Sequence, residues 1–145
     1  MKIIILSLLI CLTISYKTVP AIEYARKYCR YSGPYYDYDM KDEPANFVSK
    51  CLIAGGMNFS GCSGVNNKGA IPSAANLRSC LISKGWKYSK GISKQFKAGY
   101  PFFSNNQHSM IATYVKGKFL KYCAHVNDRC DNDLTAPDDY YYYYL

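Results

Sequence analysis

The spacing of apolar and polar positions predicts a chain that begins with helices and ends with strands. In Pro20–Tyr31, apolar residues recur at the three- and four-residue spacing of an amphipathic helix. Two more helices are expected, one from Pro44 to the glycine pair at Gly55 and one from Ser73 to Lys84. The following segments have the β-branched and aromatic composition of strands: Tyr100–Phe103, His108–Val115, Lys118–His125 and Tyr140–Tyr144. The order predicts an α+β fold with N-terminal helices packed on a small antiparallel sheet.

The two histidines of the chain fall within this predicted sheet. A two-residue turn at Lys116-Gly117 would pair Val115 with Lys118. In that register His108 lies directly opposite His125, with Cβ atoms about 4.5–5.5 Å apart. One β-bulge would break the pairing. Two histidines that face each other at a strand end indicate a site rather than core filling.

The N-terminus has the pattern of a secretory signal peptide. Lys2 precedes the apolar run Ile3–Ile14, and small and polar residues follow it. The run is shorter than the roughly 20 apolar residues of a transmembrane helix, so no membrane anchor is expected. Cleavage after Ser15 divides the chain into a signal peptide, 1–15, and a single secreted domain, 16–145, that begins at Tyr16. Cleavage after Ala21 is the alternative.

Cysteine usage also indicates export. Of the seven cysteines, Cys11 lies in the predicted signal peptide. An even number in an exported chain is typical of a disulfide framework, with connectivity left open. We expect three structural disulfides among Cys29, Cys51, Cys62, Cys80, Cys123 and Cys130. No C-x-x-C pair is present, so neither a metal nor a cofactor is expected. Asn58-Phe59-Ser60 is a glycosylation sequon.

Charge is segregated along the chain, whose formal net charge is +8. All ten acids lie in Glu23–Glu43 or Asp128–Asp139, and the segment between them includes the lysine-rich stretch Lys84–Lys97. One interpretation is a solvated basic surface that aids solubility. The other is attraction to an anionic cell surface. Nucleic acid is not an expected partner, because the chain has a signal peptide and no recognised binding motif.

Glu43–Met57 reads EPANFVSKCLIAGGM and resembles the signature helix of the putative amidase domain family. This family comprises papain-like relatives of the NlpC and CHAP cell-wall amidases, and its helix reads approximately D-C-T-N-F-V-S-Q-C-L-x-A-G-G-M. The first cysteine is the family's nucleophile, and Pro44 stands at that position. HSMIATYV resembles the strand that carries the family's catalytic base, here His108. AHVNDR resembles its A-H-T-x-D-R segment, in which the histidine, here His125, orients the base.

The resemblance implies a papain-like amidase fold and leaves three functional hypotheses. The first is a secreted pseudoenzyme that lacks the nucleophile and binds a peptide, a muropeptide or a cell-surface ligand; amide hydrolysis lost in His108→Ala would contradict it. The second is an active cysteine amidase or peptidase that uses a displaced thiol, which requires a free reactive cysteine. The third is a cationic effector or toxin that acts through Lys84–Lys97.

Overall fold

The computed structural model describes residues 15–30, 44–125 and 127–145. Three helices precede the sheet: α1 (Thr18–Tyr28), α2 (Pro44–Ala54) and α3 (Ala74–Ser83). The starts of α2 and α3 are as expected, whereas α1 begins two residues before the expected Pro20. Two expectations lie outside the described residues. These are the apolar run of the signal peptide, Ile3–Ile14, and the end of the first helix at Tyr31.

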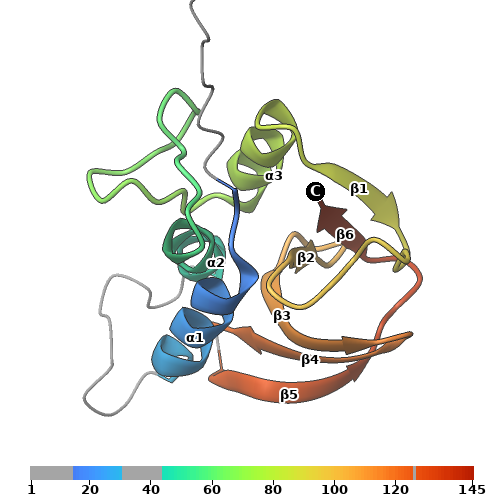
Figure 1. The fold of residues 1–145 in the computed structure, drawn as a ribbon. Helices are drawn as coiled ribbons and strands as arrows, with labels where there is room; N and C mark the ends of the chain where they lie inside the picture. Colours follow the sequence, from blue (N-terminus) through green and yellow to red (C-terminus); the bar gives the residue numbers. More distant parts are fainter. Residues whose placement is uncertain (1–14, 31–43, 126) are drawn as a thin grey trace, which may run out of the picture.

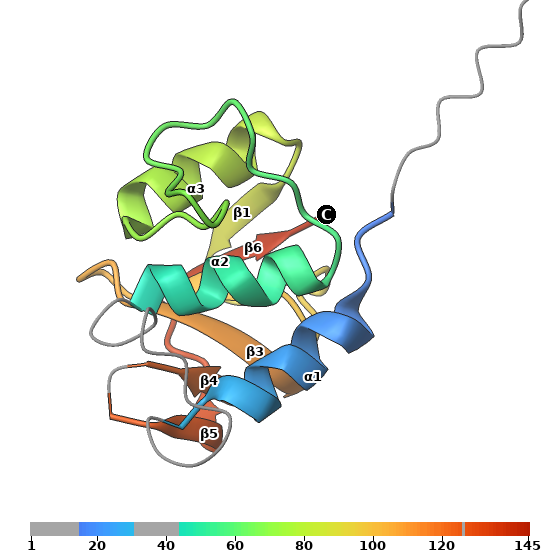
Figure 2. The same cartoon turned by 90° about the vertical axis from the view of Figure 1, so that its left-hand side faces the viewer.

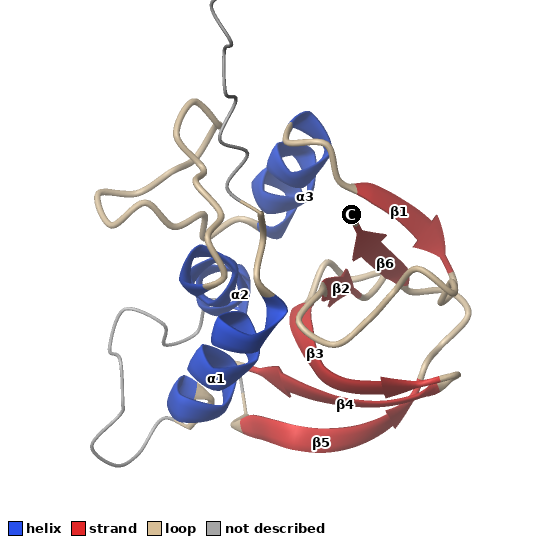
Figure 3. Cartoon of the chain, in the orientation of Figure 1, coloured by secondary structure: helices blue, strands red, loops and turns tan. Residues whose placement is uncertain are grey.

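Six antiparallel strands form one sheet in the order β1-β6-β2-β3-β4-β5 (Figure 1). Their bounds are β1 Lys87–Lys90, β2 Pro101–Phe103, β3 Ser109–Lys116, β4 Phe119–Ala124, β5 Arg129–Thr135 and β6 Tyr141–Tyr144. The helices gather on one side of the molecule and the curved sheet occupies the other (Figure 3). The α+β prediction is confirmed.

The sheet has two strands that the sequence did not predict. β1 and β5 are its edge strands, and their sequences KYSK and RCDNDLT are polar and partly exposed. An edge strand has a solvent-exposed side, so it needs no regular alternation of apolar residues. The tyrosine-rich β6 was predicted, and it lies between β1 and β2 with Tyr142 and Tyr143 fully buried.

Helix α2 is the most deeply buried helix of those that the structure describes. Its buried residues are Ala45, Asn46, Phe47, Val48, Ser49, Cys51 and Leu52. It packs against α1 and across β3 (Figure 2). The helix ends at Ala54, and at the next residue, Gly55, a side chain would collide with the Tyr16 ring and the Lys17 carbonyl oxygen. The Lys17 amide donates to the Gly55 carbonyl at 2.8 Å, so a glycine is needed for this close approach.

Helix α3 is capped at both ends. The Ser73 side chain accepts a hydrogen bond from the Asn76 amide at 3.3 Å, and Gly85 follows the helix with a φ of +95°. Trp86 is buried and packs edge-on against Tyr16 and Tyr100, with ring centroids 5.2 Å away in each case.

The prediction of three disulfides is wrong. Two are present, Cys29–Cys130 and Cys62–Cys80, while Cys51 and Cys123 are buried free thiols. Cys29–Cys130 links the end of α1 to β5, and Cys62–Cys80 links the loop after α2 to α3. The disulfides are consistent with an extracellular protein. Within the described ranges, the helices fall short of the length and apolar character that crossing a membrane requires.

Candidate functional site

The β3–β4 hairpin has a different register from the predicted one. Val115 pairs with Leu120 and Lys116 with Phe119, so the loop residues are Gly117 and Lys118. Gly117 has a φ of +58°, as the first position of a primed hairpin turn requires. The predicted Lys116-Gly117 turn is therefore wrong.

A bulge shifts the same hairpin again between Ala112 and Tyr114, so that Ile111 pairs with Cys123. The Thr113 hydroxyl at this bulge donates to the carboxylate of Asp131 in β5. Continuing the register beyond Ile111 brings His125 opposite Ser109. The expected direct pairing of His108 with His125 is consequently not formed.

His125 follows β4 and is completely buried. Its ring stacks on that of Phe47, with centroids 4.2 Å apart and planes 7° apart. Its Nε2 atom lies 2.7 Å from the Tyr28 carbonyl oxygen. Because a carbonyl oxygen only accepts, Nε2 carries the hydrogen of this bond. His125 thus joins the end of β4 to both α1 and α2.

His108 lies in the connection between β2 and β3 and is partly buried. Its carbonyl accepts from the Ser104 amide at 3.0 Å, and its amide donates to the Ser104 hydroxyl at 3.1 Å. The preceding residue, Gln107, has a φ of +60°, a left-handed conformation unusual for a non-glycine residue. Such backbone persists only where its surroundings fix it. Figure 2 shows this β2–β3 connection at the same end of the molecule as the start of α2.

The environment of His108 keeps its imidazole neutral. Burial lowers the pKa of His108 from its ordinary 6.5, and the positive charge of Arg129 lowers it further. A neutral imidazole at physiological pH has a lone pair with which it can accept a proton. His108 therefore has the protonation state of a general base.

Pro44, which the resemblance aligns with the family's nucleophile, is the first residue of α2. Proline suits this position, because the missing N–H would have no partner within the helix. Its side chain offers no nucleophilic atom. The nearby Ser49 hydroxyl is buried, donates to the Asn46 carbonyl at 2.9 Å and accepts from the Ile71 amide at 3.0 Å.

The two free thiols are poor nucleophiles. Burial raises the pKa of Cys51 well above its ordinary value, and the neighbouring Cys123 raises it further. Burial also raises the pKa of Cys123, to about 11. Only a thiolate attacks readily, and both side chains stay protonated at neutral pH.

Sequence reasoning missed two contributors to this region, Arg129 and Gln107. Arg129 lies within the quoted AHVNDR segment, but its charge acts on His108 only because the fold brings the first residue of β5 within electrostatic range of that side chain. Gln107 has no local signal at all, because asparagine or glycine is the usual residue at positive φ.

One comparison with known proteins found a match. The family model described as putative amidase domain matches residues 15–105, which is more than half of the chain. No curated protein and no solved structure matches. The matched residues include the three helices and Pro44, and they end before His108 and His125.

The pKa of His108 should lie below 6.5 in an NMR titration of the folded protein. Arg129→Gln removes the second cause of the shift, so the pKa should rise but remain below 6.5, because burial persists. Lys87→Gln is the matched charge control. Since the unfolded chain binds this proton at about pH 6.5 and the folded chain only at lower pH, His108 lowers the stability of the fold as pH falls below 6.5. A value at or above 6.5 would contradict this account.

Iodoacetamide should label neither free thiol rapidly in the native chain from Tyr16 to Leu145. After unfolding without reductant, the intact mass should show two labels, at Cys51 and Cys123. Lys94→Cys, which places a thiol at an exposed loop position, gives the reference rate. Rapid native labelling of either thiol would contradict its burial, and no label after unfolding would mean a third disulfide.

Proposed function

This chain belongs to the putative amidase domain family, and on that premise we propose that it is a secreted pseudoenzyme with a papain-like fold. It binds a peptide or muropeptide at the start of α2 and does not cleave it. A single observation carries the proposal: Pro44 occupies the first position of α2 and has no nucleophilic atom.

The rest of the candidate site supports binding. The first turn of a helix has backbone N–H groups without intrahelical partners, which can donate to the carbonyl oxygens of a ligand. The neutral imidazole of His108, in the β2–β3 connection, can accept a hydrogen bond from a ligand amide. Without a thiol or hydroxyl to deprotonate, the same imidazole has no catalytic partner. Hydrogen bonding to a peptide thus remains possible where amide cleavage is not.

The runner-up function, an amidase with a displaced thiol, needs an accessible thiolate. Cys51 and Cys123 are the free cysteines of the described residues, and both are buried with raised pKa values. Cys51 is also seven residues beyond Pro44, about 10 Å further along the helix axis. Neither thiol meets the requirement.

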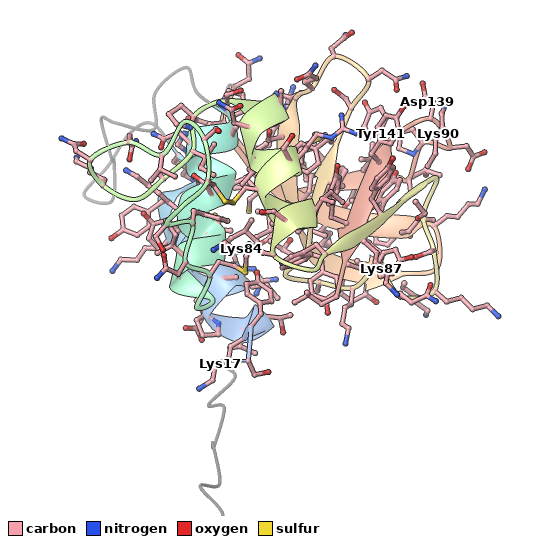
Figure 4. All side chains as sticks on the ribbon, turned by 90° about the horizontal axis from the view of Figure 1, so that it is seen from above. Lys17, Lys84, Lys87, Lys90, Asp139 and Tyr141 are labelled. Atoms are coloured by element: carbon pink, nitrogen blue, oxygen red, sulfur yellow. A yellow bond between two sulfur atoms is a disulfide. The ribbon has the colours of Figure 1, made fainter. Side chains whose placement is uncertain are left out.

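Attraction to an anionic cell surface is a second candidate function, favoured by one observation. Five lysines around β1 are all exposed: Lys84, Lys87, Lys90, Lys94 and Lys97. Figure 4 shows the first three from the end of α3 along β1. The chain has a formal net charge of +8. These exposed lysines would therefore attract the protein to anionic surfaces such as bacterial walls or lipid headgroups. Surface attraction of this kind would concentrate the domain near muropeptides.

Muramyl dipeptide is a suitable probe for the main proposal, since it contains both the sugar and the amide bond of a muropeptide. Titration into the labelled protein should shift the NMR amide signals of Ala45 and His108, because these lie at the start of α2 and before β3. Mass spectrometry should find the dipeptide intact after long incubation. The variant His108→Ala should bind more weakly.

The two alternative results are distinct. Hydrolysis that disappears in His108→Ala would overturn the pseudoenzyme proposal. Saturating muramyl dipeptide without shifts at either residue would overturn the binding proposal.

Pro44→Cys should produce a thiol with a lowered pKa. The helix N-terminus stabilises a thiolate, so the pH midpoint of its alkylation rate should lie below about 8.5. Lys94→Cys, an exposed loop position, should show the ordinary midpoint. The double variant Pro44→Cys/His108→Ala tests whether the imidazole interacts with this thiol. If it does, the pH midpoint of the alkylation rate should differ from that of Pro44→Cys alone. Equal midpoints in all three proteins would mean that His108 and α2 no longer form a common site.

A further inference from the structure

A surface depression lies beside the candidate site, between α3, the edge of the sheet and the β2–β3 connection. Its volume is about 260 Å³, and its lining includes Arg78, Ser79, Ile82, Tyr88, Gln107 and Tyr143. Gln107 directly precedes His108, so the depression borders the connection that carries the candidate base. We call it the Arg78 depression.

The guanidinium of Arg78 is held in place by aromatic side chains. Its Nε donates to the Tyr143 hydroxyl at 2.9 Å. Its central carbon lies 4.5 Å from the Tyr141 ring centroid and 5.6 Å from that of Phe103. Stacking on aromatic faces is favourable for a planar cation and limits its rotation. The donors of Arg78 are therefore oriented before any ligand arrives.

Arg78 forms no ion pair with any residue that the structure describes. The three described ion pairs join Arg26 to Asp131, Lys118 to Asp138 and Lys121 to Asp133. The Tyr143 hydroxyl is the hydrogen-bond acceptor of Arg78 within the described ranges and occupies only Nε. A guanidinium has five N–H donors, and paired donors match the two oxygens of a carboxylate. The four remaining donors have no hydrogen-bond acceptor among the described residues.

Two large apolar side chains line the same depression and remain open to solvent. Tyr88 is 51% exposed and Ile82 is 45% exposed. The Tyr88 ring stacks on Tyr143, with centroids 5.3 Å apart and planes 25° apart. The ring that orients the arginine therefore also supports an apolar wall beside it. A ligand that fits both features carries a carboxylate next to an apolar or ring-bearing group.

We propose that the Arg78 depression is a subsite for the free C-terminal carboxylate of a peptide whose last side chain is apolar or aromatic. Arg78 binds the carboxylate, and Tyr88 and Ile82 contact the side chain. The peptide orientation rests on the proposed function, since Gln107 lines the depression and directly precedes His108. A peptide bound there would extend from its carboxylate towards the candidate site.

The test compares N-acetyl-Ala-Phe with its C-terminal amide, which differs only in lacking the carboxylate. Affinities are measured from the NMR signals of Ser79, Tyr88 and Gln107, which line the depression. The free acid should bind about 10- to 100-fold more tightly, as expected for hydrogen bonds to a charged group. Equal affinity of acid and amide would overturn the proposal, and so would acetate binding as tightly as the acid.

Four variants separate the Arg78 contact from general attraction between charges. Arg78→Gln should remove the preference for the acid, and Arg78→Lys should restore only part of it, because lysine lacks the planar pair of donors. Tyr143→Phe should weaken binding of the acid by releasing Nε. Lys87→Gln removes one exposed positive charge from the adjoining strand β1 and should keep the preference. Near-UV circular dichroism of each variant checks its packing, and equal preferences in Arg78→Gln and Lys87→Gln would overturn the proposal.

Failure of this proposal differs from failure of the proposed function. If muramyl dipeptide shifts Ala45 and His108 while Arg78→Gln retains the acid preference, only the Arg78 subsite is wrong. If Arg78→Gln abolishes that preference while muramyl dipeptide leaves Ala45 and His108 unshifted, the carboxylate subsite holds and the proposed binding at the start of α2 is wrong.

Discussion

The burial of α2 is the constraint around which the other elements are placed. This helix packs against α1, α3, β3 and β4, so neither of its ends can move without opening the core. At its C-terminal end, Gly55 admits the Tyr16 ring and the backbone of Lys17. Near its N-terminal end, Phe47 stacks on His125. Both ends are therefore fixed relative to the sheet, as a site at the helix start requires.

The His125 contacts show how one residue can serve structure in a region expected to serve chemistry. The resemblance implied an orienting role towards His108, yet the described hydrogen bond of Nε2 is to the Tyr28 carbonyl. A buried carbonyl without a partner is unfavourable by about 1–3 kcal/mol, so this bond contributes to the docking of α1. The ring also covers Phe47. The described contacts of His125 are therefore with the first turns of α2, through Phe47, and with the end of α1, through Tyr28.

Local patterns in the sequence were sufficient for the helices and for β6, because caps, apolar stripes and aromatic runs act within a few residues. They were insufficient for β1 and β5, whose polar edge positions resemble loops. The hairpin register depended on the Thr113 bulge and its contact with Asp131 in another strand. Cysteine parity likewise predicted three disulfides, whereas bonding requires two cysteines to meet in the fold. Among the candidate site residues, Pro44 begins α2 as expected, but the relation of His108 to His125 depended on non-local pairing.

Charge segregation along the chain supports the proposed binding role of Arg78. Arg78 lies in the part of the chain that contains no acid, so a carboxylate partner would have to come from a distant segment. The described acids of the C-terminal segment that form ion pairs have other partners. The Arg78 guanidinium is partly buried and has the Tyr143 hydroxyl and the Tyr141 ring as described partners, and burying a charge is unfavourable unless it is paired. A bound carboxylate would supply the missing partner.

An enzyme gains rate only from interactions that strengthen in the transition state, whereas a binding protein gains affinity from interactions made to the ligand itself. An oriented arginine in a protein whose α2 begins with proline is therefore consistent with the binding function proposed above.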